Sequence, residues 1–130
     1  MSKKALKVRK YIPTEHEECV LLKQWLDLMV NNGKVVLYSH IPHETYTKSW
    51  NQKLKNKQVG VKKGVPDYVI VTKKLVLFVE MKRTKGGVVG EEQKQWIEAI
   101  NNASTGINAR VCKGFDEAKE FIETAIKKRN

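Results

Sequence analysis

The chain has 130 residues, of which 41% are hydrophobic and 30% are charged, and 25 lysines and arginines against 14 acidic residues give a net charge of +11. This composition excludes a disordered chain and is typical of one globular domain that needs no metal or disulfide cross-links to fold. No segment approaches the roughly 20 apolar residues that span a bilayer, and no apolar block follows the basic N-terminus. We therefore expect a cytoplasmic protein with a polyanionic partner and no membrane association.

Residues 1–13 are interpreted as a flexible basic arm, and residues 14–130 as a single domain that begins with a helix. Thr14 is a suitable N-cap, acidic residues follow it, and apolar residues recur at helical spacing to about residue 31. Residues 34–41 are rich in branched and aromatic side chains and predict a strand. Residues 47–57 are compatible with a short helix. Two cysteines lie in apolar periodic segments and are interpreted as core residues: Cys19 and Cys112.

The second half of the chain predicts two adjacent strands, a helix, a strand and a final helix. The strands at 68–71 and 75–81 are separated by a three-residue turn, which indicates an antiparallel hairpin. A helix from about 91 to 102 then leads to a strand at 107–112, and an amphipathic helix ends the chain. Because that crossover passes through a helix, we expect the last strand to be parallel to the 75–81 strand. The order predicts an α/β fold with a mixed central sheet flanked by helices.

Two segments contain lysine or arginine but no acidic residue, namely residues 2–10 and residues 45–66. One such run is usually a solvated face, but two in a chain this basic favour a nucleic-acid surface. Trp50 lies within the second segment and is a candidate for a contact with nucleic acid or with a second subunit. The candidate DNA-binding residues are Lys48, Lys53, Lys55, Lys57, Lys62, Lys63 and Lys85.

The chemistry is expected where GVPD, which ends at Asp67, faces VEMK, which contains Glu80 and Lys82. Side chains alternate along a strand, so Glu80 and Lys82 share one face and Met81 points to the core on the other. Two neighbouring carboxylates are hard oxygen ligands suited to Mg²⁺ or Mn²⁺, which would neutralise a phosphate and lower the pKa of an attacking water. A lysine beside them can hold or deprotonate that water.

Polar residues on two helices point toward the same region. Gln93 lies on the sheet-facing stripe of the 91–102 helix, where a buried polar group needs a partner. Glu15 and Glu18 lie on the apolar stripe of the first helix, and either could reach the same metal. Both glutamates could instead be ordinary N-terminal helix charges.

Together these motifs resemble the PD-(D/E)XK nuclease superfamily: GVPD, then EMK, then a helix carrying Gln93, preceded by a helix that opens with TEH. Within it, the chain is similar to the virus-type replication-repair nuclease (VRR-NUC) family over about residues 14–126. The resemblance implies that Asp67 and Glu80 bind the metal. It also implies that Lys82 is the motif lysine and that Gln93 is the glutamine of the following helix.

The same resemblance implies that the main-chain carbonyl of Met81 completes the metal shell. It implies that Glu15, or as a second choice Glu18, is the acid of the first helix. Small members of the family consisting of this domain alone resemble homodimeric endonucleases that cut four-way DNA junctions. The resemblance therefore implies a Mg²⁺- or Mn²⁺-dependent endodeoxyribonuclease with branched DNA as its substrate.

Two other interpretations remain open. The chain could be a nuclease of restriction or repair type that acts on linear or flapped duplex DNA. It could also be a basic DNA-binding module that has the fold without the activity. In that case Asp67 would be a turn residue, and Glu80 and Lys82 an exposed cross-strand pair.

Overall fold

The computed structural model describes residues 11–42 and 49–129, which contain four helices and four strands. The first ten residues of the predicted basic arm, and Lys48, lie outside this range. In chain order the elements are α1 (Glu15–Asn31), β1 (Leu37–His40), α2 (Trp50–Gln58), β2 (Tyr68–Val71), β3 (Val76–Lys82), α3 (Glu91–Ala103), β4 (Ile107–Lys113) and α4 (Phe115–Arg129).

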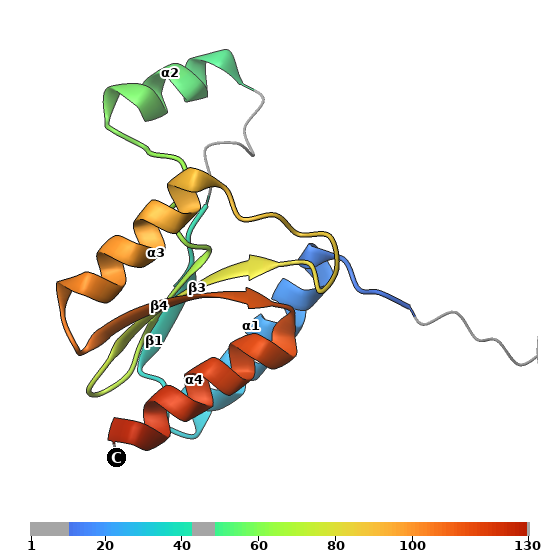
Figure 1. Ribbon diagram of the computed structural model, residues 1–130, viewed down its shortest axis with the longest axis vertical. Helices are drawn as coiled ribbons and strands as arrows, with labels where there is room; N and C mark the ends of the chain where they lie inside the picture. The colour runs from blue at the N-terminus through green and yellow to red at the C-terminus, as the bar shows by residue number, and fades with distance from the viewer. Residues whose placement is uncertain (1–10, 43–48, 130) are drawn as a thin grey trace, which may run out of the picture.

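The four strands form one sheet in the order β1-β2-β3-β4. β2 pairs with both β1 and β3 in antiparallel fashion, and β3 pairs with β4 in parallel. α1 and α4 contact each other on one side of the sheet and α3 lies on the other side, as Figure 1 shows. The predicted hairpin, the predicted parallel crossover and the α/β class are therefore confirmed. No helix of the described residues has the length and apolar content to cross a membrane.

α1 begins where the sequence predicts, because Thr14 and Glu17 form a reciprocal N-cap. The Thr14 hydroxyl accepts a hydrogen bond from Glu17 N, and the Glu17 carboxylate accepts one from Thr14 N, each at 3.1 Å. β1 is shorter than the predicted strand 34–41. Lys34 N and Val35 N both donate to Met29 O, so these residues complete the C-terminal turn of α1 before the strand begins.

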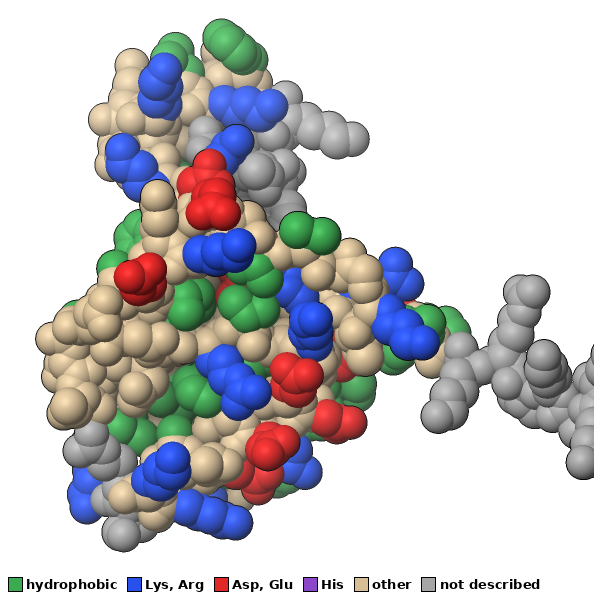
Figure 2. Space-filling model, viewed as in Figure 1, with side chains coloured by type: hydrophobic (Ala, Val, Ile, Leu, Met, Phe, Trp, Pro, Cys, Tyr) green, Lys and Arg blue, Asp and Glu red, His purple; other side chains and the backbone are tan. Residues whose placement is uncertain are grey.

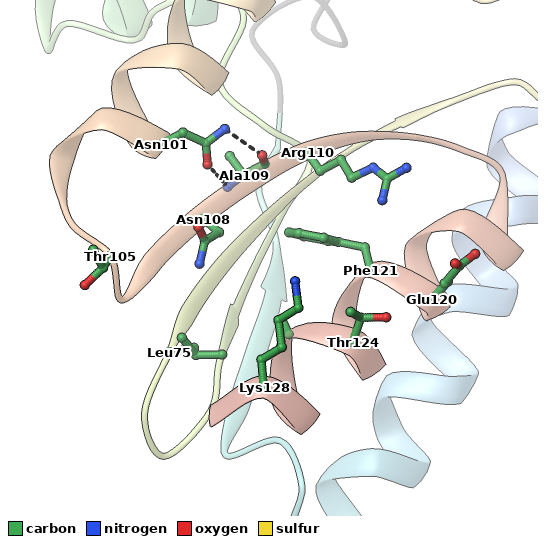
Figure 3. A pocket seen from close by; sticks show the side chains of 11 residues that line it. Leu75, Asn101, Thr105, Asn108, Ala109, Arg110, Glu120, Phe121, Thr124 and Lys128 are labelled. Atoms are coloured by element: carbon green, nitrogen blue, oxygen red, sulfur yellow. Dashed lines mark hydrogen bonds between the residues drawn. The ribbon is translucent and has the colours of Figure 1, made fainter. Parts of the chain in front are cut away.

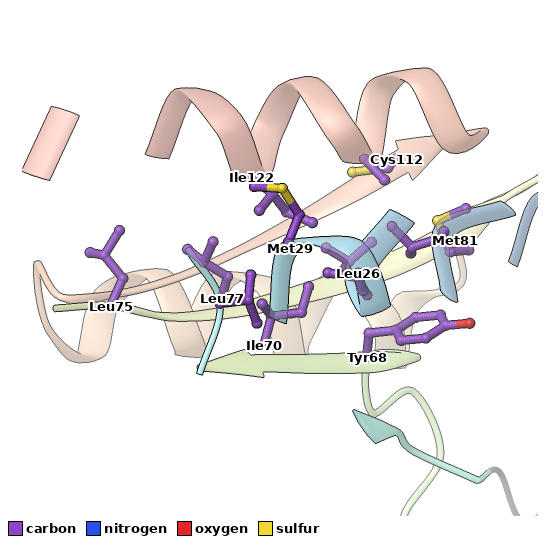
Figure 4. Close-up of a cluster of buried hydrophobic side chains, with 13 residues drawn as sticks. Leu26, Met29, Tyr68, Ile70, Leu75, Leu77, Met81, Cys112 and Ile122 are labelled. Atoms are coloured by element: carbon purple, nitrogen blue, oxygen red, sulfur yellow. The ribbon is translucent and has the colours of Figure 1, made fainter. Parts of the chain in front are cut away.

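The core lies between the sheet and the α1–α4 pair (Figure 4). Along β3 the odd-numbered positions Leu77, Val79 and Met81 are fully buried, whereas Val76 and Phe78 are half-buried on the other face. This is the predicted alternation, and it directs Glu80 away from the apolar core. Cys112 is buried and Cys19 packs against the cluster, as predicted, and neither forms a disulfide in the described chain. The labelled core residues include Leu26, Met29, Tyr68, Ile70, Leu75 and Ile122.

α2 differs from the other helices because it projects from the body of the molecule (Figure 1). It begins at Trp50 rather than near residue 47, because Ser49 is its N-cap and accepts a hydrogen bond from Gln52 N at 3.2 Å. None of its residues is buried. Its fold is therefore local, and its side chains remain available to a partner.

The outer edge of β4 is covered by a side chain of α3. Asn101 Nδ2 donates to Ala109 O at 2.9 Å, and Asn101 Oδ1 accepts from Ala109 N at 2.7 Å (Figure 3). The amide thus satisfies both main-chain groups of Ala109 in the way a neighbouring strand would. Farther along the same strand, Lys113 N donates to the carboxylate of Glu117 at 3.0 Å.

Candidate active site

Asp67 and Glu80 lie beside each other at the ends of two paired strands. Tyr68 pairs with Val79, so the residue before β2 stands opposite the residue after Val79 in the antiparallel register. Asp67 is only 6% exposed, and its Oδ2 accepts a hydrogen bond from Met81 N at 2.6 Å. That bond ties the carboxylate of Asp67 to the main chain of β3 between Glu80 and Lys82. The structure therefore brings together the two predicted acids.

Glu80 is a buried carboxyl group whose environment opposes ionisation. Burial, together with the negative charge and hydrogen bond of the neighbouring Asp67, raises the pKa of Glu80 to about 9. The positive charge of Lys82 acts in the opposite direction, and the charge of Glu15 adds to the increase in that pKa. At neutral pH the Asp67–Glu80 pair therefore holds a proton, as close carboxylates do when no cation lies between them.

One oxygen of Glu80 lacks a donor. The residue is 3% exposed, and once both carboxyl groups are ionised no N–H or O–H group of the described chain donates to its Oε1. Buried polar atoms are almost always paired, so an unpaired oxygen at the side of a second carboxylate requires an explanation. A divalent cation that displaced the shared proton would supply the missing interaction, since Mg²⁺ and Mn²⁺ prefer carboxylate oxygens. The donor set therefore fits a hard divalent cation.

Gln93 connects α3 to this pair. Its Nε2 donates to Glu80 Oε2 at 3.2 Å, and its Oε1 accepts from Gly90 N at 2.8 Å, at the beginning of α3. One side chain thus caps the helix and orients the buried carboxyl group. The prediction that Gln93 faces the sheet is confirmed. Lys82 is half-buried. It lies two residues after Glu80 on β3, so both side chains are on the same face of the strand.

The two acids of the first helix differ in their surroundings. Glu15 is half-buried, and its negative charge contributes to the raised pKa of Glu80. Glu18 is 7% exposed, and its Oε2 accepts a hydrogen bond from Phe115 N at the first turn of α4. Within residues 11–42 and 49–129, no three His, Cys, Asp or Glu side chains are grouped closely enough to hold a metal together. Glu15 therefore stands outside the close pair formed by Asp67 and Glu80.

The segment before Asp67 is held against α3 by contacts that the sequence does not reveal. Gly64 has φ of +88°, and a Cβ there would lie 2.5 Å from the carbonyl carbon of Glu92 and 2.7 Å from Gln93 N. Trp96 Nε1 donates to Lys63 O at 3.1 Å. Gly64 and Pro66 are residue types that favour turns, but their spacing does not identify the helix against which this turn packs.

The candidate DNA-binding lysines lie in two groups and on one loop. Three of them lie on α2, two lie in the segment that leads to Gly64, and Lys85 lies in the loop between β3 and α3. Figure 2 shows lysine and arginine side chains over the protruding region of α2 and across the visible face of the body. In the described chain these lysines are Lys53, Lys55, Lys57, Lys62, Lys63 and Lys85.

A pocket of about 500 Å³ lies elsewhere, between α3, β4 and α4 (Figure 3). Its walls include Arg110, Phe121 and Lys128, and neither the acidic pair nor Lys82 lines it. The acidic pair lies instead at the ends of the paired strands β2 and β3, outside this pocket.

Comparison with known proteins identifies the family. A solved structure described as a VRR_NUC domain protein has the same fold, with a TM-score of 0.68 at 24% sequence identity over 90% of this chain and 91% of that one. No curated protein matches the sequence. The sequence model of the VRR-NUC domain matches residues 10–116, which include the acidic pair, Lys82 and Gln93. With most of its length covered by that match, the chain belongs to the VRR-NUC family of nuclease-type domains.

Proposed function

We propose that this protein is a metal-dependent endonuclease that hydrolyses phosphodiester bonds in branched DNA. The observation that carries the proposal is the Asp67–Glu80 pair, in which a buried Glu80 oxygen lacks a donor. Asp67, Glu80 and the main-chain carbonyl of Met81 would bind Mg²⁺ or Mn²⁺. Glu15 would contribute from α1, through water or after a small movement, because it stands outside the close pair.

When bound, the cation supplies charge neutralisation at the scissile phosphate and lowers the pKa of the attacking water. The protein's own groups would do the rest. Lys82 would hold the water in line with the phosphorus and offset the negative charge that develops during attack. Gln93 would keep Glu80 in its orientation through the Nε2 bond. Attack would break the bond between phosphorus and the 3′-oxygen, which takes up a proton, leaving a 5′-phosphate and a 3′-hydroxyl.

Membership of the family supports a four-way junction as the substrate and a homodimer as the active form. A two-fold dimer presents two equivalent sites, and a symmetric junction needs two nicks. The net charge of +11 supports a polyanionic substrate. The chain has its acids, lysine and glutamine intact, which favours an enzyme over a binding module with a degraded site.

Cleavage of defined DNA substrates tests the proposal. Labelled four-way junction, flap and linear duplex are incubated with the protein in Mg²⁺, Mn²⁺ or EDTA. We expect junction cleavage in either metal and none in EDTA. Asp67→Asn and Glu80→Gln abolish cleavage but retain DNA binding, whereas Glu98→Gln, an exposed acid on α3, is a matched control that cuts normally. If no substrate is cut in any metal, the enzyme assignment fails.

The oligomeric state needs a separate measurement. Light scattering coupled to size-exclusion chromatography, with and without junction DNA, reports the mass of the particle. We expect twice the mass of the chain. A monomer that cuts linear or flapped duplex faster than a junction would favour the restriction or repair type of nuclease instead.

A further inference from the structure

The projecting helix α2 presents one face on which apolar and basic side chains alternate. Trp50, Lys53, Leu54 and Lys57 are spaced at i, i+3, i+4 and i+7, so they share one side of the helix. Trp50 is 76% exposed, and Leu54 is also exposed. A tryptophan so exposed on a helix that buries nothing has no role in the core and is available to a partner.

The positive charge around this face of α2 indicates which class of partner it binds. From residue 45 to residue 66 the sequence contains six lysines and no acidic residue. A second copy that paired this face with itself across a two-fold axis would bring lysines opposite lysines. A membrane surface calls for a longer helix with a broader apolar face, and α2 has nine residues with two apolar side chains on that face. Lysines beside an exposed indole are instead the combination that binds nucleic-acid phosphates and stacks on bases.

The position of α2 relative to the acidic pair defines where such DNA would lie. The chain that leaves α2 is fixed at Lys63, whose carbonyl oxygen accepts the Trp96 hydrogen bond, and at Gly64, which lies against the first turn of α3. Asp67 follows three residues later. The segment that carries α2 is therefore joined to the site through two residues that are fixed against α3, a few residues before Asp67.

We infer that α2 is a substrate-selecting element, in which Trp50 stacks on a base face left unstacked at a branch point while Lys53 and Lys57 hold the flanking phosphates. In an intact duplex both faces of each base are already stacked, so the indole gains little there. At a branch point a base face is free. Trp50 therefore adds affinity for branched over linear DNA, and the inference rests on the DNA-binding part of the proposed function alone.

Binding measured in EDTA tests this inference without any requirement for cleavage. Wild type, Trp50→Ala and Trp50→Phe are titrated with a four-way junction and a linear duplex of the same sequence, each with 2-aminopurine at the branch position. We expect Trp50→Ala to weaken junction binding about tenfold and duplex binding less than about twofold. The 2-aminopurine fluorescence change on junction binding disappears in this variant. Trp50→Phe, which keeps an aromatic ring, restores most of the preference.

Two controls separate stacking from charge and from general surface effects. Val59→Ala removes an 81% exposed apolar side chain at the C-terminal end of α2, on the side away from Trp50, and leaves both affinities unchanged. Lys53→Ala weakens binding of both DNA forms and lowers the slope of log affinity against log salt by about one, whereas Trp50→Ala leaves that slope unchanged. All variants keep the wild-type melting temperature, because α2 buries no residue.

Four outcomes would overturn the inference. These are an equal loss of junction and duplex binding in Trp50→Ala, no loss of either, conversion of a dimer to a monomer by this variant, and loss of binding to anionic phospholipid vesicles with DNA affinity intact. The third outcome would identify a second copy as the partner of α2, and the fourth a membrane surface. Any of these results, with junction cleavage retained, would remove the inference and leave the proposed nuclease activity in place. If the protein cuts no substrate but shows the Trp50-dependent preference for junction binding, the proposed nuclease activity fails and the inference stands.

Discussion

Gly64 lies so close to Glu92 that no side chain fits between them: a Cβ on Gly64 would lie 2.5 Å from the carbonyl carbon of Glu92. The atom that it would meet belongs to the main chain of α3, so it cannot turn aside as a side chain could. The contact positions the turn that leads to Asp67 and the first turn of α3, which carries Gln93. Two parts of the candidate site are therefore held together through one glycine.

We predict that Gly64→Ala lowers the free energy of unfolding by about 3 kcal/mol, from the strained positive φ together with overpacking. Gly60→Ala is the matched control, since Gly60 has the same φ of +88° and no atom within 4 Å of the added Cβ. Gly60→Ala should lower the free energy of unfolding by only about 1 kcal/mol. Denaturant unfolding measures both variants, and equal losses would show that the contact with α3 does not matter.

The pKa of Glu80 predicts how the stability of the metal-free protein depends on pH. This pKa is raised from 4.5 to about 9, so between these values the folded state binds more protons than the unfolded state. The free energy of unfolding must therefore fall as the pH rises through that window. Glu80→Gln, which cannot ionise, removes this loss and should melt several degrees above wild type at about pH 8.5 in EDTA.

The same measurement with Mg²⁺ or Mn²⁺ tests the cation site. Because a cation would replace the proton of the acidic pair, metal should raise the melting temperature of wild type more at about pH 8.5 than at about pH 6. Glu80→Gln should gain little at either pH. An equal gain in wild type and variant would place the bound metal somewhere else in the protein.

Glu15 and Glu18 should give opposite patterns when each is replaced by glutamine. Glu18→Gln weakens the bond to Phe115 N at the start of α4, so we expect a loss of about 1 kcal/mol in stability and little change in metal affinity. Glu15→Gln should leave the melting temperature unchanged and weaken metal binding by roughly tenfold. Calorimetric titration with Mn²⁺ and thermal melts distinguish the two residues. Were Glu18→Gln the variant with weaker Mn²⁺ binding, the choice of Glu15 would be wrong.

Gln93 forms one hydrogen bond that caps α3, with Gly90 N, and one within the candidate site, with Glu80. Two substitutions distinguish the effects of these bonds. Gln93→Glu can still accept from Gly90 N but cannot donate to Glu80, whereas Gln93→Ala loses both interactions. We expect both variants to lower kcat about tenfold or more, and only Gln93→Ala to lose about 1 kcal/mol of stability. Gln95→Ala, an exposed neighbour on α3, controls for the loss of a glutamine. Normal cleavage by Gln93→Glu would mean that the bond to Glu80 has no part in activity.

Local patterns in the sequence predicted the elements that depend on neighbouring residues. The alternation in VEMK predicted which residues of β3 face the core, and the Thr14 cap predicted the start of α1. The short hairpin connection and the helical crossover predicted the strand directions around β3. These are the features that spacing along the chain determines, and they were enough to bring Asp67, Glu80 and Gln93 together.

Features that depend on distant residues could not be predicted in this way. Glu18 and Glu15 share one helical stripe, so periodicity alone did not distinguish them. The difference lies in Phe115, 97 residues farther along the chain. β1 is shorter than its branched and aromatic residues suggest. The main-chain N–H groups of Lys34 and Val35 form hydrogen bonds with the C-terminal turn of α1 instead of joining the strand. Trp96 is partly exposed and donates to Lys63 O, a contact between residues 33 positions apart that the sequence does not indicate.

The amide of Asn101 has a consequence for the behaviour of the protein at high concentration. An unpaired strand edge is a template on which another molecule can build its own strand, and repeated addition produces fibrils. Asn101 is hydrogen-bonded to both the N–H and the C=O of Ala109, so these groups at the middle of β4 are not available to another strand. A strand from another molecule could pair with Ala109 only by displacing the Asn101 amide.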